Sequence, residues 1–155
     1  MLRILVVCTG NTCRSPMAEA LLRAKVQKAG KTDQIRILSA GLAGGGAFPA
    51  SYGAMMVMSM RNIDISAHSS RQLLPEYVEA ADLILTMTGS HKRAVLKLLP
   101  ASAGRVYTLA EFAGYAGDVD DPFGGDTEIY CQCAKQLEKF IDIAWEKILL
   151  LAGDS

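Results

Sequence analysis

The chain has 155 residues, half of them hydrophobic, which suits one compact domain with a single core. Its 16 Lys and Arg residues balance 16 Asp and Glu residues, so the charge gives no reason to expect nucleic acid or a membrane surface as a partner. No apolar run approaches the roughly 20 residues of a membrane span. We expect a single domain over residues 1–155 that works as a cytoplasmic monomer.

The N-terminus and the cysteines support this interpretation. The opening residues MLRILVV are too short for the core of a signal peptide and lead to a cysteine, not to a small-residue cleavage site. The cysteines form two close pairs, Cys8/Cys13 and Cys131/Cys133, whose spacings differ from the usual C-x2-C of zinc sites. A secreted disulfide scaffold usually has a shorter chain. We therefore expect reduced thiols, no metal and no cofactor.

Apolar periodicity predicts strands that alternate with helices along the chain. Residues 3–8 form a continuous Leu-, Ile- and Val-rich run, typical of a strand covered on both faces. A helix is expected next, with Ser15 as N-cap, Pro16 at its first position and Gly30 at its end. Further strands are expected over 35–39, 83–86 and 105–108, and helices over 49–61, 75–80, 90–98 and 127–151.

This alternation predicts an α/β fold. We expect a single doubly wound domain with a central four-stranded parallel sheet and helices on both faces. Ligands of such folds bind beyond the carboxyl ends of the strands. The segment directly after the first strand is therefore where a site is expected.

In that segment Cys8 and Arg14 are separated by five residues, in the run CTGNTCR. The spacing alone is a weak signal, because composition produces it by chance in about one chain in five. The buried strand before it and the helix after it strengthen the signal. Gly10 and Asn11 also tolerate the positive φ angles of a tight anion-binding loop. We call residues 8–15 the Cys8 loop.

The Cys8 loop has the chemistry to bind and attack a phosphoryl group. Backbone N–H groups at a helix N-terminus favour an oxyanion, and the same dipole with the Arg14 charge favours the nucleophilic thiolate of Cys8. The Arg14 guanidinium can hold two phosphoryl oxygens at once, and Ser15 can donate a proton to the departing thiolate. The predicted phosphate-binding residues are Thr9, Gly10, Asn11, Thr12, Cys13, Arg14 and Ser15.

A second loop, over residues 118–125 with the sequence DVDDPFGG, is the candidate source of a proton donor. Pro122 biases Asp121 toward an extended backbone, which fixes the direction of its carboxyl group. Such an acid could protonate a leaving group and later deprotonate water, although the loop alone could be a solvated turn. We call it the Asp121 loop. The chain lacks both GxxxxGK[ST] and GxGxxG, so nucleotide binding is not indicated.

Together the two loops resemble the low-molecular-weight protein tyrosine phosphatase family, whose marks are a C-x5-R-S loop near the N-terminus and a distal Asp-Pro. Ser39-Ala40-Gly41 and Ala67-His68 are further matches, so the resemblance covers essentially the whole chain. It implies hydrolysis of phosphorylated proteins through a phosphocysteine, without metal. The implied roles are nucleophile for Cys8, phosphate binder for Arg14 and general acid, then base, for Asp121.

The resemblance also gives roles to residues that support the loop. It implies that Asn11 is held in a left-handed conformation by neighbouring Ser and His side chains. Cys13 matches a second loop cysteine that can form a disulfide with the nucleophile and so prevent irreversible oxidation. The residues implied to support the loop are Ser15, Ser39 and His68.

The residue four positions after the nucleophile separates branches of the family. Tyrosine-directed members usually have Ile or Leu there, whereas this chain has Thr12, as do the bacterial protein-arginine phosphatases. A hydroxyl can contact a guanidinium, which Leu could only desolvate. Asp121 could pair with that guanidinium through two N–H donors. The pocket wall is also sparse, because Phe123 is followed by Gly124, where tyrosine enzymes often place another aromatic residue. We favour phosphoarginine, with Thr12 and Phe123 determining specificity.

Three alternatives stay open. The first is a protein tyrosine phosphatase of the same family. The second is a thiol-dependent arsenate reductase, which needs resolving cysteines near the nucleophile, whereas Cys131 and Cys133 lie in the last predicted helix without an evident route. The third is a non-catalytic phosphate-binding module, which has no use for a leaving-group acid such as Asp121.

Overall fold

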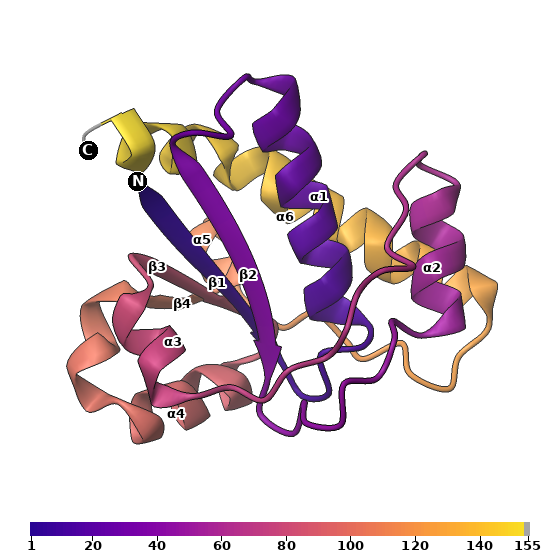
Figure 1. Cartoon of the computed structure of the whole chain (residues 1–155), viewed down its shortest axis with the longest axis horizontal. Coiled ribbons are helices and arrows are strands. Elements are labelled where there is room, and N and C mark those ends of the chain that lie inside the picture. The colour runs from indigo at the N-terminus through magenta and orange to yellow at the C-terminus, as the bar shows by residue number, and fades with distance from the viewer. Residues whose placement is uncertain (154–155) are drawn as a thin grey trace.

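A four-stranded parallel sheet forms the centre of the computed structural model, which describes residues 1–153 (Figure 1). The strands lie in the order β2-β1-β3-β4, and every neighbouring pair is parallel, as predicted. Their carboxyl ends therefore meet at one edge of the sheet. The strands are β1 (Leu2–Cys8), β2 (Ile35–Gly41), β3 (Leu83–Thr86) and β4 (Val106–Thr108).

Helices cover both faces of the sheet, which confirms the doubly wound α/β architecture. One hydrophobic cluster joins Ile4 and Val6 of β1 to α1, α2, α5 and α6; the other joins Leu5 and Val7 to α3 and α4. Because neighbouring residues of a strand point to opposite faces, β1 must be apolar along its buried part, Ile4 to Cys8, and only Arg3 near its start is charged and exposed. The helices are α1 (Arg14–Lys28), α2 (Tyr52–Ser59), α3 (Pro75–Ala80), α4 (Gly89–Leu98), the 3₁₀ helix η1 (Pro100–Arg105), α5 (Leu109–Phe112) and α6 (Thr127–Gly153).

The last helix, α6, has 27 residues and packs along α1 and α2. Its predicted apolar face is buried, including Tyr130, Cys133 and Leu137. Side chains that recur at this spacing form one stripe, which suits a helix that covers a core on one side. Within residues 1–153, no helix combines the length and the apolar character needed to cross a bilayer.

The start of α1 differs from the prediction. The helix begins at Arg14, Cys13 occupies the N-cap position, and no side chain caps the helix. Ser15 is therefore inside the first turn, and its hydroxyl lies 2.9 Å from Cys8 Sγ instead of capping the backbone. The prediction of Ser15 as N-cap was wrong because the hydroxyl has a partner across the loop.

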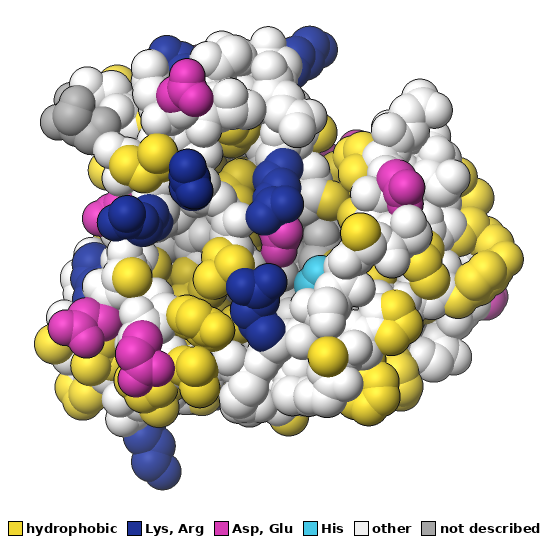
Figure 2. All heavy atoms as spheres, in the orientation of Figure 1, with side chains coloured by type: hydrophobic (Ala, Val, Ile, Leu, Met, Phe, Trp, Pro, Cys, Tyr) yellow, Lys and Arg dark blue, Asp and Glu magenta, His cyan; other side chains and the backbone are white. Residues whose placement is uncertain are grey.

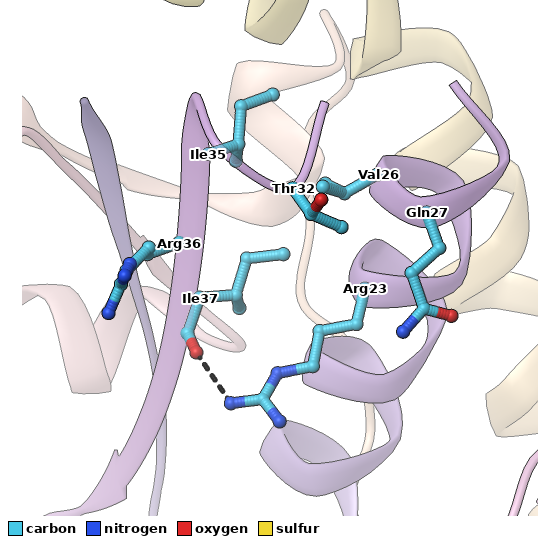
Figure 3. Close-up of a pocket in the computed structure, with 7 residues that line it drawn as sticks. All are labelled: Arg23, Val26, Gln27, Thr32, Ile35, Arg36 and Ile37. Carbon is cyan, nitrogen blue, oxygen red and sulfur yellow. Dashed lines mark hydrogen bonds between the residues drawn. The ribbon is translucent and has the colours of Figure 1, made fainter. Parts of the chain in front are cut away.

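The outer edge of β2 is partly covered by a side chain of α1. Figure 3 shows Arg23 extended across a shallow pocket of about 210 Å³, where its Nη2 donates a 2.9 Å hydrogen bond to the Ile37 carbonyl. Occupying an edge carbonyl in this way discourages pairing with another strand. The pocket lies toward the amino-terminal end of β2, whereas Cys8 pairs with Gly41 at the carboxyl end, so it is separate from the Cys8 loop.

Candidate active site

The Cys8 loop continues from the carboxyl end of β1 and turns into α1, as parallel α/β folds place their sites. Its first part is tied to the chain after β2, since Leu42 N–H donates to the Cys8 carbonyl and Ala43 N–H to the Thr9 carbonyl. Gly41 makes this approach possible. A Cβ at position 41 would lie 2.6 Å from the Thr9 oxygen and 2.9 Å from the Asn11 nitrogen, closer than any side chain tolerates.

Asn11 is fully buried and has a φ of 56°, so the loop turns through a left-handed residue. Its carbonyl oxygen Oδ1 accepts from Arg71 N–H at 2.9 Å, which fixes the orientation of the amide. The amide nitrogen then donates to Ser15 Oγ at 2.8 Å and to Ser39 Oγ at 2.9 Å. His68 Nε2 lies 2.7 Å from the Asn11 carbonyl and donates to it.

These bonds determine where the hydroxyl protons point. Ser15 Oγ accepts from Asn11, so its own proton is free to donate to Cys8 Sγ at 2.9 Å. A hydrogen bond donated to sulfur stabilises the thiolate more than the thiol. Ser39 likewise accepts from Asn11 and donates to Glu19. The hydrogen bonds that hold the loop therefore orient the Ser15 hydroxyl proton toward Cys8 Sγ.

An open cavity of about 700 Å³ lies behind the loop, between α1 and the segment before α3. Figure 2 shows this face, where Lys and Arg side chains surround a hollow that holds an acidic side chain and a histidine. Glu19 and His68 both line the cavity. Glu19 accepts a hydrogen bond from Ser39, and His68 donates one to the Asn11 carbonyl. Arg23 forms a 3.0 Å ion pair with Glu19 there. The sequence analysis did not identify Glu19, which lies one helical turn after Ser15.

Arg14 connects the two predicted loops. Its guanidinium is buried, its Nη1 donates to the Val119 carbonyl at 2.9 Å, and its Nη2 lies 3.6 Å from Asp121 Oδ2. Its Nε is buried without a hydrogen-bond partner in the described chain. Because an unpaired buried guanidinium N–H is costly, Nε is a donor available to an oxyanion in the Cys8 loop.

The Asp121 loop is more exposed than the Cys8 loop. The side chain of Asp121 is 52% exposed, and Asp121 Oδ1 accepts from Phe123 N–H at 3.0 Å in a tight turn. Phe123 is 75% exposed. Asp118 Oδ1 accepts from Gly89 N–H at 2.9 Å, which ties the loop to the start of α4. The carboxyl group of Asp121 is thus open to solvent on one side and to Arg14 on the other.

Thr12 and Cys13 occupy the turn into α1. Thr12 is partly buried, and its carbonyl accepts from Ser51 N–H at 2.8 Å. Cys13 is buried, with its sulfur 3.3 Å from the Tyr130 hydroxyl and 3.4 Å from Ser51 Oγ. Burial, together with the hydrogen bond to Cys13, raises the pKa of Tyr130 to about 12, so the phenol stays protonated as a donor. Cys8 and Cys13 are both free thiols.

The sequence analysis missed His91, which lies in the first turn of α4. Its Nε2 lies 2.8 Å from Thr9 Oγ1, next to the nucleophile. Burial, and then the nearby Arg14 charge, lower the pKa of His91 to about 4, so the ring is neutral at pH 7. One signal was available in the sequence: the strands of a parallel sheet all end at one edge, so residues just after the predicted strand 83–86 lie at the same edge as the Cys8 loop.

Cys133 lies closer to the site than the sequence suggested. It is buried in α6, with Sγ 3.9 Å from the Asp120 carbonyl. Burial raises the pKa of the Cys133 thiol to about 12, which leaves almost no reactive thiolate at neutral pH. This argues against a resolving role as in an arsenate reductase. Among residues 1–153, no group of three or more His, Cys, Asp or Glu side chains is placed to hold a metal ion.

Comparison with known proteins agrees with this fold and site. Residues 3–148 match the family described as low molecular weight phosphotyrosine protein phosphatase, and the chain belongs to that family. A protein-arginine-phosphatase from Geobacillus stearothermophilus is 42% identical over 147 residues, which are 94% of this chain and 95% of the relative.

Solved structures extend the comparison. A low molecular weight protein tyrosine phosphatase from T. tengcongensis superposes with a TM-score of 0.90 at 43% identity, covering 95% of this chain and 99% of the other. A cysteine-to-serine mutant of the YwlE arginine phosphatase, with a phosphorylated active-site serine, superposes with a TM-score of 0.89 at 36% identity, covering 95% of each chain. The relatives thus include both arginine and tyrosine phosphatases.

Proposed function

We propose that this protein is a cysteine-dependent protein phosphatase that removes phosphoryl groups from arginine side chains through a phosphocysteine at Cys8. The observation that carries the proposal is the meeting of two loops far apart in sequence. Arg14, six residues after the nucleophile in the Cys8 loop, lies 3.6 Å from the Asp121 carboxylate. This contact supports a site in which nucleophile, phosphate binder and proton donor act on one phosphoryl group.

In the first step the Cys8 thiolate attacks phosphorus, and the bond from phosphorus to the leaving nitrogen breaks. Asp121, in its protonated form, gives its proton to that nitrogen. The backbone N–H groups of the Cys8 loop and the Arg14 guanidinium hold the three remaining phosphoryl oxygens, whose charge they stabilise in the transition state. The product is phosphocysteine and a free guanidinium.

In the second step water attacks the phosphocysteine and Asp121, now a carboxylate, accepts the water proton. The sulfur–phosphorus bond breaks and the electron pair returns to Cys8. Ser15 supports this departure because its hydroxyl proton points to the sulfur. The phosphorylated serine in the YwlE mutant supports a covalent intermediate at the equivalent step. The reaction uses no cofactor and no metal.

Thr12 supports phosphoarginine as the substrate. Its partly buried side chain stands in the turn of the Cys8 loop, where Ile or Leu would make the wall apolar. Once it has given up its proton, the exposed Asp121 carboxylate can accept two N–H bonds from the departing guanidinium, and Phe123 can pack against the guanidinium plane. The arginine phosphatase from Geobacillus stearothermophilus is consistent with this assignment.

Phosphotyrosine is the second candidate substrate. The exposed ring of Phe123 could pack on a phenol as well as on a guanidinium, and the relative from T. tengcongensis is a tyrosine phosphatase. The two substrates differ in hydrogen bonding, because only the guanidinium offers N–H donors beside the scissile bond. Specificity therefore depends on polar groups at the mouth of the site.

We further propose one phosphatase domain over residues 1–155 that acts on phosphorylated proteins in the cytoplasm as a monomer, without nucleic-acid or membrane partners. A single sheet with both faces covered supports one domain. Free thiols at all cysteines, Cys8, Cys13, Cys131 and Cys133, support a reducing compartment. The balanced charge of 16 basic and 16 acidic residues gives no reason to expect nucleic acid as a partner.

We also propose Cys13 as the redox partner of Cys8. A peroxide would oxidise the Cys8 thiolate to a sulfenic acid, and the Cys13 sulfur would then displace water to form a disulfide. Both sulfurs are free thiols in one loop, which supports the pairing.

The test of the proposed substrate is the ratio of kcat/KM for a phosphoarginine protein to kcat/KM for a phosphotyrosine peptide. We expect the unmodified protein to favour phosphoarginine and Thr12→Ile to shift the ratio at least about tenfold toward phosphotyrosine. Thr12→Ser keeps a hydroxyl and is the matched control, with an unchanged preference. A preference for phosphotyrosine in the unmodified protein would overturn the assignment.

A further inference from the structure

The mechanism uses Thr9 only through its backbone N–H, and it uses neither the Thr9 hydroxyl nor the His91 side chain, which contact each other. Thr9 directly follows the nucleophile and has an exposed side chain, whereas His91 is only 5% exposed. Their atoms Oγ1 and Nε2 are 2.8 Å apart, although the residues are 82 positions apart in sequence. The side chain of His91 is thus buried, and its one hydrogen-bond contact within the described residues is the exposed Thr9 hydroxyl of the Cys8 loop.

The two ring nitrogens of His91 have different surroundings, which fixes the position of the proton. Nε2 contacts Thr9 Oγ1, whereas Nδ1 is buried without a hydrogen-bond partner in the described chain. A proton on Nδ1 would leave a buried N–H without an acceptor, near the positive charge of Arg14. An unused lone pair costs less than an unpaired buried N–H. The proton is therefore on Nε2, and His91 donates to Thr9.

This direction of donation determines what Thr9 can offer. Its oxygen accepts one bond from His91 and keeps its own proton and a second lone pair. No other hydrogen bond of this hydroxyl occurs within residues 1–153. Because Thr9 is exposed, the remaining lone pair and proton face the mouth of the loop, not the core.

The surroundings of the pair show which part of a substrate would meet it. The Asp121 loop is tied to the start of α4, because Asp118 Oδ1 accepts from Gly89 N–H at 2.9 Å, two residues before His91. Arg14 belongs to the phosphate-binding part of the site and Asp121 to the part that protonates the leaving group. Thr9 directly follows Cys8 and contacts the same start of α4, so its hydroxyl is on the side of the Cys8 loop that faces the Asp121 loop.

We propose that Thr9 is a specificity-determining residue that binds the guanidinium of phosphoarginine, and that His91 is the positioning residue that orients its hydroxyl. The inference rests on the proposed function. The free lone pair of Thr9 Oγ1 accepts an N–H of the guanidinium, and a phenol ring has no such donor at that place. A site with a polar group aimed at a substrate N–H rejects a substrate that lacks it.

A purely structural role for His91 predicts something different. If the histidine only joined α4 to the Cys8 loop, its loss would lower activity equally on every phosphorylated substrate. Thr88 provides the matched control, because its Oγ1 caps α4 by accepting from His91 N–H at 3.1 Å and has no bond to Thr9. Thr88→Val weakens the same helix start without removing the side-chain contact.

The experiment compares kcat/KM for a phosphoarginine peptide with kcat/KM for p-nitrophenyl phosphate in single and double variants. Thr9→Val and His91→Leu should each lower the ratio about tenfold, the size of one lost hydrogen bond to a charged group. The double variant should lose no more than the larger single loss, because both changes remove the same contact. Thr9→Ser and His91→Gln retain the hydroxyl and an N–H donor, so they should stay within about threefold of the unmodified ratio.

The outcomes separate this inference from the proposed function. Three results would overturn the proposed role of Thr9 and His91 in specificity. They are equal losses of kcat/KM on both substrates, a change of the ratio in Thr88→Val as large as in His91→Leu, and additive losses in the double variant. If the unmodified protein hydrolyses phosphoarginine and all variants keep its ratio, only the pair is overturned. If the unmodified protein hydrolyses p-nitrophenyl phosphate but not phosphoarginine, both proposals fail.

Discussion

The Cys8 loop and the Asp121 loop meet at Arg14, yet they are held in different ways. In the Cys8 loop, Asn11 and Ser15 are completely buried and joined by side-chain hydrogen bonds that reach to Ser39. In the Asp121 loop, Asp121 is 52% exposed and Phe123 is 75% exposed. The first loop is fixed before a substrate arrives, and the second is open to solvent.

This difference assigns separate tasks to the two loops. Phosphoryl transfer requires donors placed in advance around the oxygens, which a loop held by the buried side-chain hydrogen bonds of Asn11 provides. Recognition of the leaving group depends on side chains that are at least partly exposed and can vary without disturbing the core, those of the Asp121 loop together with Thr9 and Thr12 of the Cys8 loop. One phosphate-binding loop can therefore serve relatives that act on arginine and relatives that act on tyrosine.

The largest expected effect is that of Arg14→Lys, which tests the fixed half of the site. Lys cannot hold two phosphoryl oxygens in a planar fork, so kcat/KM for every substrate should fall about a thousandfold. Arg71→Lys is the control, because Arg71 contacts Asn11 through its backbone N–H, which the substitution keeps. The kcat/KM of this variant should stay within about twofold of that of the unmodified protein. Steady-state kinetics with p-nitrophenyl phosphate measures both. A loss below tenfold for Arg14→Lys would contradict its role.

Asp121→Asn tests the exposed half. An amide cannot give a proton to the leaving group, so phosphoenzyme formation with a poor leaving group should slow about a hundredfold, and much less with p-nitrophenol. Rapid-quench kinetics with aryl phosphates of increasing leaving-group pKa measures the difference. Asp120→Asn, one residue earlier in the same loop, is the control. If Asp121→Asn slowed phosphoenzyme formation equally with all leaving groups, Asp121 would not be the general acid that protonates the leaving group.

Asn11→Ala compares the two loops by stability. The change removes bonds to Ser15 and Ser39, leaves Arg71 N–H unpaired and forces Ala to a φ of 56°. The free energy of unfolding should fall by about 2 kcal/mol. Phe123→Ala, in the exposed loop, should change it by less than about 0.5 kcal/mol. Urea denaturation of both variants checks this, and similar losses would mean that the loops are equally fixed.

The smallest expected effect concerns pH and His91. Its pKa falls from an ordinary 6.5 to about 4 on folding, because of burial and then Arg14, while Asp118 and Asp121 act in the opposite direction. Between pH 6.5 and pH 4, His91 therefore binds a proton in the unfolded chain but stays neutral in the folded protein, so the free energy of unfolding decreases as the pH falls through this range. The loss should be on the order of 1 kcal/mol at pH 5. His91→Leu should lose less stability between pH 7 and pH 5 than the unmodified protein; an equal loss would show that His91 is not responsible.

Much of the fold could be predicted because the strands are either wholly apolar or flanked by clear breaks. Helix α3 and strand β3 have the predicted bounds, 75–80 and 83–86. The short helix α5 was missed, since four residues are too few for a periodic pattern and its stability comes from a capping box between Thr108 and Glu111. The 3₁₀ helix η1 was missed because its sequence, PASAGR, has no apolar periodicity.

The site was less predictable than the fold. The spacing of Cys8, Arg14 and Asp121 is visible in the sequence, but the contact of Arg14 with Asp121 depends on the order of strands. Glu19 and His91 were missed because each looks like an ordinary helix residue. Only the folded chain brings Glu19 to Ser39 and His91 to Thr9, which explains why single-residue patterns could not find them.

The central claim is that a covalent phosphocysteine forms at Cys8. The most direct measurement is peptide mass spectrometry of acid-quenched Asp121→Asn protein, after mixing with p-nitrophenyl phosphate, whose good leaving group needs little protonation. Without the base, hydrolysis of the intermediate slows, so a phosphoryl group should accumulate on the Cys8 sulfur at the rate of the p-nitrophenol burst. A phosphoryl group on another side chain, or steady turnover with no burst and no phosphoenzyme, would contradict the mechanism.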